Sequence, residues 1–346
     1  MPKLVDANVH AVVASETVLL PYLSAHWRDY VTSSGVRAPD TAAYPRSLPP
    51  AARAEPAPEA GLPGSRAEHA ARTLFDNWSV DVAVLNCQYG VSAIHNADLA
   101  AALAAAVNDW QVEEWLAVDP RFRAAIVVPN QEPEDALREL ERCATRTGFV
   151  QALLPVRSET PYGKRRWHRF FEAAAESELP VALCLGGGYG MPTSSSGWPS
   201  FISEEHVDVS QAAQSQLLSL VTEGVFERFP RLRVVIVECG FAWLPSLLWR
   251  FDKNWKALRN EVPWVKRLPS EYLLEQVWLT THPLEPATAT DLLDTIDMLG
   301  GADKLLWGSN YPRYDAPSPQ AAFPPGVPDA VRHELLGGNA TRLYQL

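Results

Sequence analysis

The sequence predicts an α/β protein folded as a distorted (β/α)8 TIM barrel, and a repeating pattern carries this prediction. Eight short runs rich in Val, Leu and Ile alternate with longer amphipathic segments. Nearly continuous apolar strands between helices indicate a parallel sheet that is covered on its outer side. Eight such units within 346 residues favour a closed barrel over an open sheet. The eight predicted strands are residues 3–10, 81–87, 123–129, 149–155, 180–186, 232–238, 277–281 and 304–309.

The spacers between these runs have the length and apolar periodicity of helices. Each lies between two predicted strands, as the repeat requires. The clearest predicted helices are residues 97–116, 133–145, 165–178, 211–229 and 289–299. We therefore expect one barrel domain over residues 1–346.

Two segments interrupt the repeat. Residues 37–65 are rich in Pro and Ala, and residues 186–208 are rich in Gly and Ser. They follow the first and fifth predicted strands, so both should lie at the C-terminal end of the barrel. They are either surface loops or lids over a site, since long loops in compact domains are often functional. We expect lids.

Composition narrows the class of partner. The formal net charge is −11 and the pI is near 5.3, which disfavours nucleic acid and anionic membranes, because both attract clustered Lys and Arg. No window approaches the roughly 18 apolar residues of a membrane span, and the first residues do not resemble a signal peptide. Four scattered Cys without CxxC pairs suggest neither a disulfide framework nor a zinc knuckle. We expect a cytoplasmic protein that acts on a small molecule, either as a monomer or as a homo-oligomer.

Polar side chains gather where the predicted strands end, which is where TIM barrels carry their chemistry. The candidates at these ends are Asp6, Asn8, His10, Cys87, His95, Asn130, Pro155, Cys184, Glu238, Cys239, His282 and Asn310. An unpartnered carboxylate after an apolar strand would be costly, so Glu238 should be hydrogen-bonded or functional. Either histidine alone could be satisfied by backbone groups, and buried thiols are usually inert packing. The remaining histidines, His206 among them, have the context of surface residues.

Three stretches resemble a known family. They are "NADLAAALAAAVNDWQVEEWLAVDPRFRAAIVVPNQEPEDALRELER", "GVFERFPRLRVVIVECGFAWLPSLLWRFDKNW", and "GSNYPRYD" followed by "GNATRLY". The chain resembles the amidohydrolase superfamily, in its decarboxylase-like amidohydrolase 2 branch. That resemblance implies a distorted barrel with one or two divalent metals. The family's ligands come from a His/Asp-x-His motif after the first strand, a His at the fifth, often a His or acid at the sixth, and an Asp at the eighth.

This sequence departs from that ligand pattern. The first motif reads Asn8-Val9-His10, the fifth-strand position is Cys184, the sixth is Glu238 and the eighth is Asn310. An amide carries no charge and cannot act as a general base, so Asn310 cannot activate water as the family's Asp does. Three coordinated changes favour loss of the metal. A rearranged His/Cys/acid zinc site stays possible on residue types alone.

We therefore expect a metal-independent enzyme without cofactor that acts on a small organic molecule by acid/base or nucleophilic catalysis, through hydrolysis, C–C cleavage or cyclisation. The expected catalytic residues are His10, His282, Glu238 and Cys184. The expected substrate-binding residues are Asn8, Asn310, His95, Trp198, Tyr311 and Arg313. Two alternatives remain: a metal-dependent hydrolase or decarboxylase with a rearranged metal site, and a non-catalytic relative that binds a small molecule.

Overall fold

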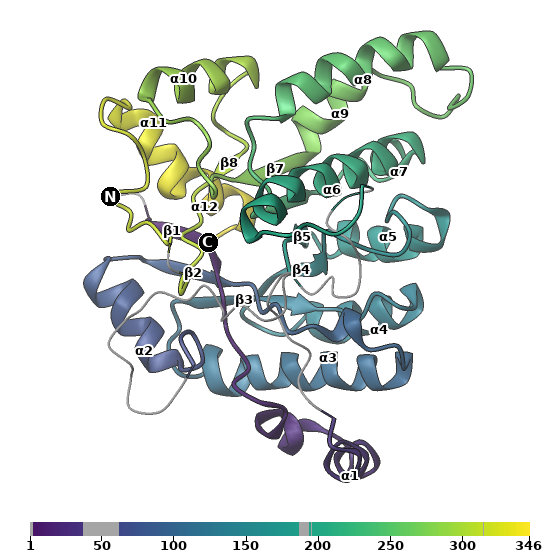
Figure 1. Cartoon of the computed structure of the whole chain (residues 1–346), viewed down its shortest axis with the longest axis vertical. Coiled ribbons are helices and arrows are strands. Elements are labelled where there is room, and N and C mark those ends of the chain that lie inside the picture. The colour runs from purple at the N-terminus through teal and green to yellow at the C-terminus, as the bar shows by residue number, and fades with distance from the viewer. Residues whose placement is uncertain (1–2, 37–61, 187–193, 195, 314) are drawn as a thin grey trace.

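The predicted barrel is confirmed. The computed structural model describes residues 3–36, 62–186, 194, 196–313 and 315–346. Its eight strands are all parallel and lie side by side in chain order (Figure 1). They are β1 Val5–Val9, β2 Val82–Leu85, β3 Phe122–Val127, β4 Phe149–Pro155, β5 Val181–Cys184, β6 Val234–Val237, β7 Val277–Thr280 and β8 Leu305–Leu306.

Hydrogen bonds between β1 and the segment that follows β8 close the barrel. The Ala7 N–H donates to the Trp307 carbonyl at 2.9 Å, the Asn310 N–H donates to the Asn8 carbonyl at 2.9 Å, and the His10 N–H donates to the Tyr311 carbonyl at 2.8 Å. These contacts place His10 and Asn310 at the same end of the barrel.

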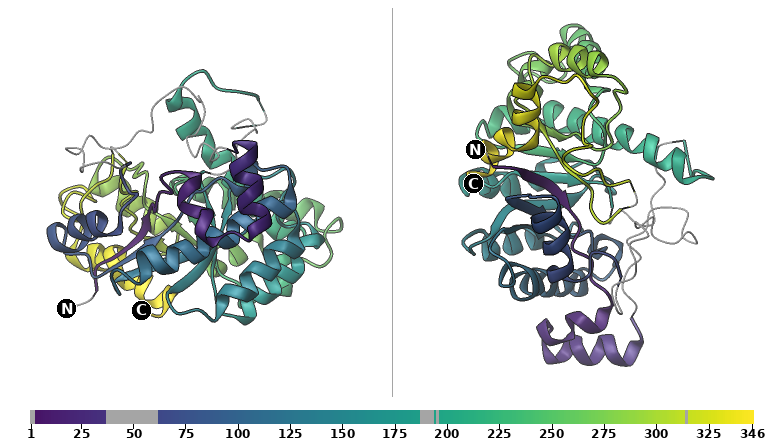
Figure 2. Two further views of the ribbon diagram at one scale, coloured as in Figure 1. Left: turned by 90° about the horizontal axis from the view of Figure 1, so that it is seen from below. Right: turned by 90° about the vertical axis from the view of Figure 1, so that its left-hand side faces the viewer.

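Most of the α-helices cover the outside of the barrel, while α1 stands off from it (Figures 1 and 2). The α-helices are α1 Ala25–Ser34, α2 Ala67–Ala71, α3 Ala97–Gln111, α4 Pro133–Ala144, α5 His168–Glu176, α6 Ile202–Thr222, α7 Val225–Arg228, α8 Leu244–Leu258, α9 Pro269–Gln276, α10 Ala289–Met298, α11 Asp329–His333 and α12 Asn339–Tyr344. Within the described ranges, no helix is both long and apolar enough to cross a membrane.

The barrel interior is mostly apolar, and the C-terminal helix closes its N-terminal end. Small and β-branched side chains of the strands, such as Ala7, Val84 and Ala182, form one buried cluster with Leu343 and Tyr344 of α12. The Tyr344 hydroxyl donates to Gln151 Oε1 on β4 at 2.8 Å. The C-terminal helix therefore fills the N-terminal end of the barrel and leaves the opposite end for a site.

The second expected lid is partly a helix. Helix α6 begins at Ile202, so residues 202–208 are helical, and the helix predicted for residues 211–229 starts nine residues too late. The Glu204 carboxylate explains the early start, because it accepts from the backbone N–H groups of Ser200 and Phe201, both at 2.7 Å. The Gly- and Ser-rich composition of this segment predicted a loop, and the capping by Glu204 was not recognised.

Each expected lid segment has a described end, and both of these ends lie at the C-terminal end of the barrel. The Gly64 carbonyl accepts from the Val12 N–H at 2.8 Å, and a Cβ on Gly186 would lie 2.7 Å from the Gln88 side chain. Residues 37–61, 187–193 and 195 lie outside the described residues, so the lid role stays a prediction.

Candidate active site

A buried carboxylate forms the centre of the polar site at the C-terminal end of the barrel. Glu238 directly follows β6, is 2 % exposed and has a φ of 60°. Its backbone N–H donates to Thr280 Oγ1 on β7 at 3.1 Å. A left-handed backbone is unfavourable for Glu and is found where the surrounding structure imposes it, often at functional sites.

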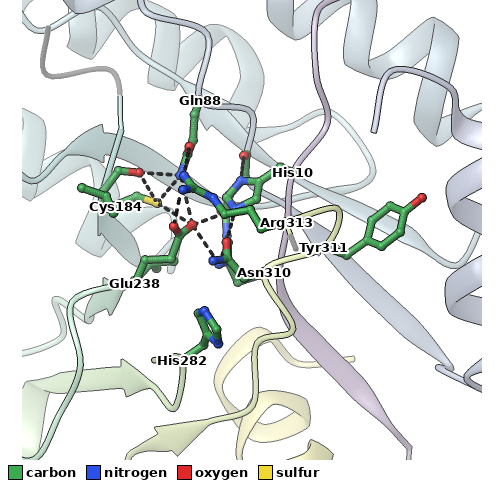
Figure 3. A network of polar contacts seen from close by, with 12 residues as sticks. His10, Gln88, Cys184, Glu238, His282, Asn310, Tyr311 and Arg313 are labelled. Atoms are coloured by element: carbon green, nitrogen blue, oxygen red, sulfur yellow. Dashed lines mark hydrogen bonds and ion pairs between the residues drawn. The ribbon is translucent and has the colours of Figure 1, made fainter. Parts of the chain in front are cut away.

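Donor groups converge on the Glu238 carboxylate from several strands (Figure 3). Its Oε1 lies 2.7 Å from His10 Nε2, and it accepts from Asn8 Nδ2 at 2.9 Å and Gln88 Nε2 at 3.0 Å. Its Oε2 lies 3.5 Å from Arg313 Nη2. Burial alone would raise the pKa of Glu238, but the charges of His10 and Arg313 and these hydrogen bonds hold it well below its ordinary value. Glu238 is therefore an ionised carboxylate.

Asn310 bridges Glu238 and His282. Asn310 also has a left-handed backbone, with a φ of 65°, which Asn adopts more readily than most residues. Both polar ends are satisfied when its NH₂ group faces Glu238, at 3.1 and 3.2 Å from the two oxygens, and its carbonyl accepts from His282 Nε2 at 3.1 Å. An Asp here would place a second carboxylate against Glu238, so the amide fits this neighbour.

A chain of hydrogen-bonded amide side chains connects the site to the barrel interior. His10 Nδ1 lies 3.2 Å from the Asn86 carbonyl, and Asn86 Nδ2 donates to Asn8 Oδ1 at 2.9 Å. Gln151 Nε2 donates to Asn86 Oδ1 at 2.7 Å. Asn86 and Gln88 were not among the predicted site residues, although they flank Cys87, which was considered at the same strand end.

Asp6 ties β1 to the segment after β8, directly behind Asn8 and Asn310. Its Oδ1 accepts from the backbone N–H groups of Asn8 at 3.1 Å and Ser309 at 2.9 Å. Complete burial raises the pKa of Asp6 to about 6, against the lowering effect of the Ser309 hydrogen bonds. Asp6 therefore fixes the backbone that carries the two site amides.

His282 is paired with an acid that the sequence analysis missed. Its Nε2 lies 3.3 Å from Asp315 Oδ2, and the residue is 9 % exposed. Burial would raise the pKa of Asp315, but the hydrogen bond from His282 and its charge hold it below the ordinary value. The signal was present, because Asp315 closes the stretch "NYPRYD" that carried the family resemblance.

The other predicted site residues differ in whether their surroundings suit the expected role. Burial and the adjacent Glu238 charge raise the pKa of the Cys184 thiol well above its ordinary value, which does not suit a nucleophile. Tyr311 points away from the cluster (Figure 3), and its buried ring packs edge-on against Trp78. Tyr311 therefore does not join the cluster that Asn310 faces, and its substrate-binding role stays a prediction. His95 and Trp198 are exposed, and their roles stay predictions.

A small cavity lies beside Cys184. Its volume is about 20 Å³, the space of about one water molecule. The lining includes Gln88, Tyr89, Val127, Leu153 and Cys184. An aromatic substrate would need more room than this cavity provides.

The described side chains do not fit the metal that the resemblance implies. Among residues 3–36, 62–186, 194, 196–313 and 315–346, no group of three or more His, Cys, Asp or Glu could hold a metal ion. The positions Asn8, Cys184 and Asn310 supply two neutral amides and a protonated thiol. N–H groups, which a cation would repel, face Glu238 from Asn8 and Gln88. No step below therefore runs through a metal ion.

Decarboxylases are prominent among the similar proteins. The chain is 28% identical over 284 residues to a gamma-resorcylate decarboxylase of Polaromonas sp., covering 79% of this chain and 86% of that protein. A crystal structure of a 5-carboxyvanillate decarboxylase from Sphingomonas paucimobilis aligns with a TM-score of 0.70 and 24% identity over all of both chains. A dihydroxybenzoic acid decarboxylase from Polaromonas sp. aligns with a TM-score of 0.67 and 23% identity over 100% of this chain and 98% of that one.

These relatives correct the expected function. The structure of the Polaromonas dihydroxybenzoic acid decarboxylase contains bound manganese and the inhibitor 2-nitroresorcinol. The relatives therefore contradict the expectation of a metal-independent enzyme of unspecified reaction and agree better with the alternative of a metal-dependent decarboxylase. Asn8, Cys184 and Asn310 are the positions at which this chain differs from the metal site that the resemblance implies.

Family membership rests on a match over nearly the whole chain. A sequence model described as Amidohydrolase matches residues 5–346, from the first residue of β1 to the last residue of the chain. The match includes every strand and every site residue described above. The chain is an enzyme of the amidohydrolase family.

Proposed function

We propose that this protein is a decarboxylase, a lyase that removes the carboxyl group of a hydroxylated aromatic acid as CO₂. The observation that carries the proposal is the His282–Asp315 pair, which stands beside the donor-rich cluster around Glu238. Decarboxylation needs a group that delivers a proton to a ring carbon and a pocket that fixes the ring. The family's decarboxylase relatives support this choice of reaction.

The reaction balances with one proton. The ring carbon that bears the carboxylate takes a proton, the bond from that carbon to the carboxyl carbon breaks, and its electron pair restores the aromatic ring. CO₂ leaves, and the hydroxylated arene remains. His282 delivers the proton from Nδ1, because its Nε2–H is engaged by Asp315 and the Asn310 carbonyl. Asp315 stabilises the protonated imidazole and fixes the orientation of the imidazole ring. Asn310 contributes a carbonyl to the same imidazole.

Arg313 is placed to hold the ring's hydroxyl oxygens. Its side chain is 20 % exposed, and its Nη2 contacts Glu238 and, at 3.3 Å, Gln88 Oε1. A guanidinium has five N–H donors, so these contacts leave donors for a substrate. Glu238, His10 and Asn8 act through Arg313 and Asn310 as positioning residues, because they fix the charges behind the substrate.

Direct assay tests this function. Purified protein is incubated with 2,6-dihydroxybenzoate, 5-carboxyvanillate and other hydroxylated benzoates, and CO₂ and the arene product are quantified. Parallel reactions with manganese chloride and with a chelator report on a cation separately from the reaction class. We expect equal amounts of CO₂ and arene from at least one acid. Folded protein that decarboxylates none of them in either condition would contradict the proposal.

A further inference from the structure

Arg157 lies two residues after β4 and has buried N–H donors that no described residue uses. Its Nη1 donates to Glu205 Oε1 at 2.8 Å, and its side chain is 11 % exposed. Its Nε and Nη2 are buried and have no hydrogen-bond partner among the described residues. These two N–H groups lie on the same edge of a guanidinium, which is the edge that binds a carboxylate through two parallel hydrogen bonds.

The backbone around Arg157 is fixed close to the site. Arg157 is the second residue after β4, and the preceding residue, Val156, donates its N–H to the Cys184 carbonyl at 2.8 Å. Gln216 of α6 donates to the Val156 carbonyl at 3.0 Å. The backbone before Arg157 is thus held between β5 and α6. Cys184, which accepts the Val156 hydrogen bond, has its thiol 3.7 Å from Glu238 Oε1.

The first turns of α6 carry the partner of Arg157. Glu205, the partner of Arg157, is fully buried there, and its Oε2 has no partner among the described atoms. Burial lowers the pKa of the next residue, His206, and the charge of the Arg313 guanidinium lowers it further. His206 is partly exposed, but its Nε2 is buried and unpartnered within the part of the chain that the structure describes.

Leaving charged donors buried without a partner is costly, and a single hydrogen bond to Glu205 does not use them. We infer that Arg157 is a specificity-determining residue that binds a second acidic group on the substrate, one that stays on the ring during decarboxylation. This inference rests on the proposed function, which it deepens by naming the substrate class as aromatic acids with two acidic groups.

The chemistry assigns Arg157 to the retained group. The carboxylate that leaves as CO₂ loses its charge during the reaction, so a paired guanidinium would stabilise the ground state more than the transition state. A retained carboxylate keeps its charge throughout. Binding it stabilises both states equally, which lowers KM and leaves kcat unchanged.

Kinetics of Arg157→Gln on two substrates test the inference. The probes are 5-carboxyvanillate, which has two carboxylates, and 2,6-dihydroxybenzoate, which has one. We expect the substitution to raise KM for 5-carboxyvanillate roughly 10- to 100-fold at nearly constant kcat, since hydrogen bonds to charged groups contribute about 1.5–3 kcal/mol. KM for 2,6-dihydroxybenzoate should change less than about threefold. Arg169→Gln, which removes an exposed Arg paired with Glu134, is the matched control.

Binding measurements separate this inference from the proposed function. Titration of isophthalate and benzoate by calorimetry needs no turnover. Tighter binding of isophthalate that is lost in Arg157→Gln and retained in Arg169→Gln would support the inference even if no acid is decarboxylated. An unchanged ratio of the two affinities in folded Arg157→Gln, or equal KM changes for both substrates, would overturn it. If Arg157→Gln does not fold, the same two titrations are made on Arg157→Lys. The ratio of isophthalate affinity to benzoate affinity should then fall relative to wild type, because an ammonium cannot bind a carboxylate through two parallel hydrogen bonds.

Discussion

The inner and outer parts of the site differ in how completely their polar groups are paired. In the inner part, both oxygens of Glu238 have partners, and His10 and Asn8 are buried and hydrogen-bonded on both sides. In the outer part, Arg157 and His206 have buried polar atoms without partners, and Arg313 is partly exposed. Paired groups fix charge and geometry around Glu238, whereas unused donors suit a ligand. We therefore expect inner substitutions to reduce stability and outer ones to change turnover or affinity.

Glu238→Gln should have the largest effect. It leaves His10 and Arg313 without their shared buried counter-charge, and removing one partner of a buried ion pair typically costs about 3–5 kcal/mol. Urea denaturation at pH 7 should show a loss of this size and little decarboxylation. Because the pKa of Glu238 is lowered in the folded state, its stabilisation is present above the unfolded-state pKa. The difference from wild type should therefore shrink as the pH falls below about 4.5.

Glu134→Gln is the control for Glu238→Gln. It removes an exposed carboxylate paired with Arg169 and should change the unfolding free energy by less than about 1 kcal/mol. Equal effects of the two substitutions would show that the inner network does not stabilise the barrel.

His282→Asn should affect turnover and not stability. Loss of the proton-delivering group should lower kcat by roughly 10²- to 10⁴-fold, while the denaturation midpoint stays near that of wild type because His282 lies at the edge of the network. Asp315→Asn should lower kcat less, since the imidazole remains. A kcat for His282→Asn close to wild type would assign proton transfer elsewhere, and His10→Asn is the comparison that would show it.

Asp6→Asn should change the pH dependence of stability. The pKa of Asp6 is raised from 3.8 to about 6 in the folded protein, so between these pH values the folded state binds more protons than the unfolded state. Asp6 therefore makes stability fall as the pH rises from about 4 to 6, by about 3 kcal/mol in total. The Asn variant should lack this decrease in urea denaturation measured at half-unit pH steps. Identical pH profiles would contradict the raised pKa.

The sequence predicted the barrel well because periodicity encodes local structure. The fourth strand, residues 149–155, and the helical segment 97–116 were predicted with the bounds that they have. The predicted residues His10, Glu238, Asn310 and Arg313 lie together, because strand ends in a barrel share one face, and their roles stay predictions. Asp315, Gln88 and Arg157 were missed, since they lie two to nine residues beyond the last residue of a strand, where the path of the loop decides the direction of a side chain. Asn310 and Arg313 lie in such a loop too, within the stretch that resembles the family. The start of α6 was missed because a side-chain cap overrode a loop-like composition.

Cys184→Ser should have the smallest effect, and it tests the one predicted nucleophile. The thiol lies 3.3 Å from the Leu185 carbonyl and 3.7 Å from Glu238 Oε1, where a negative thiolate would be repelled by the carboxylate. Its raised pKa keeps it protonated at neutral pH, so it acts as a donor within the inner network. A serine hydroxyl is also a donor, and we expect kcat to stay within about threefold of wild type. Cys87→Ser, a second buried thiol without contact to Glu238 among the hydrogen bonds of the described residues, is the matched control. A loss of activity above a thousandfold in Cys184→Ser, with Cys87→Ser unaffected, would show that the thiol reacts covalently and would move the chemistry from the outer part of the site to the inner one.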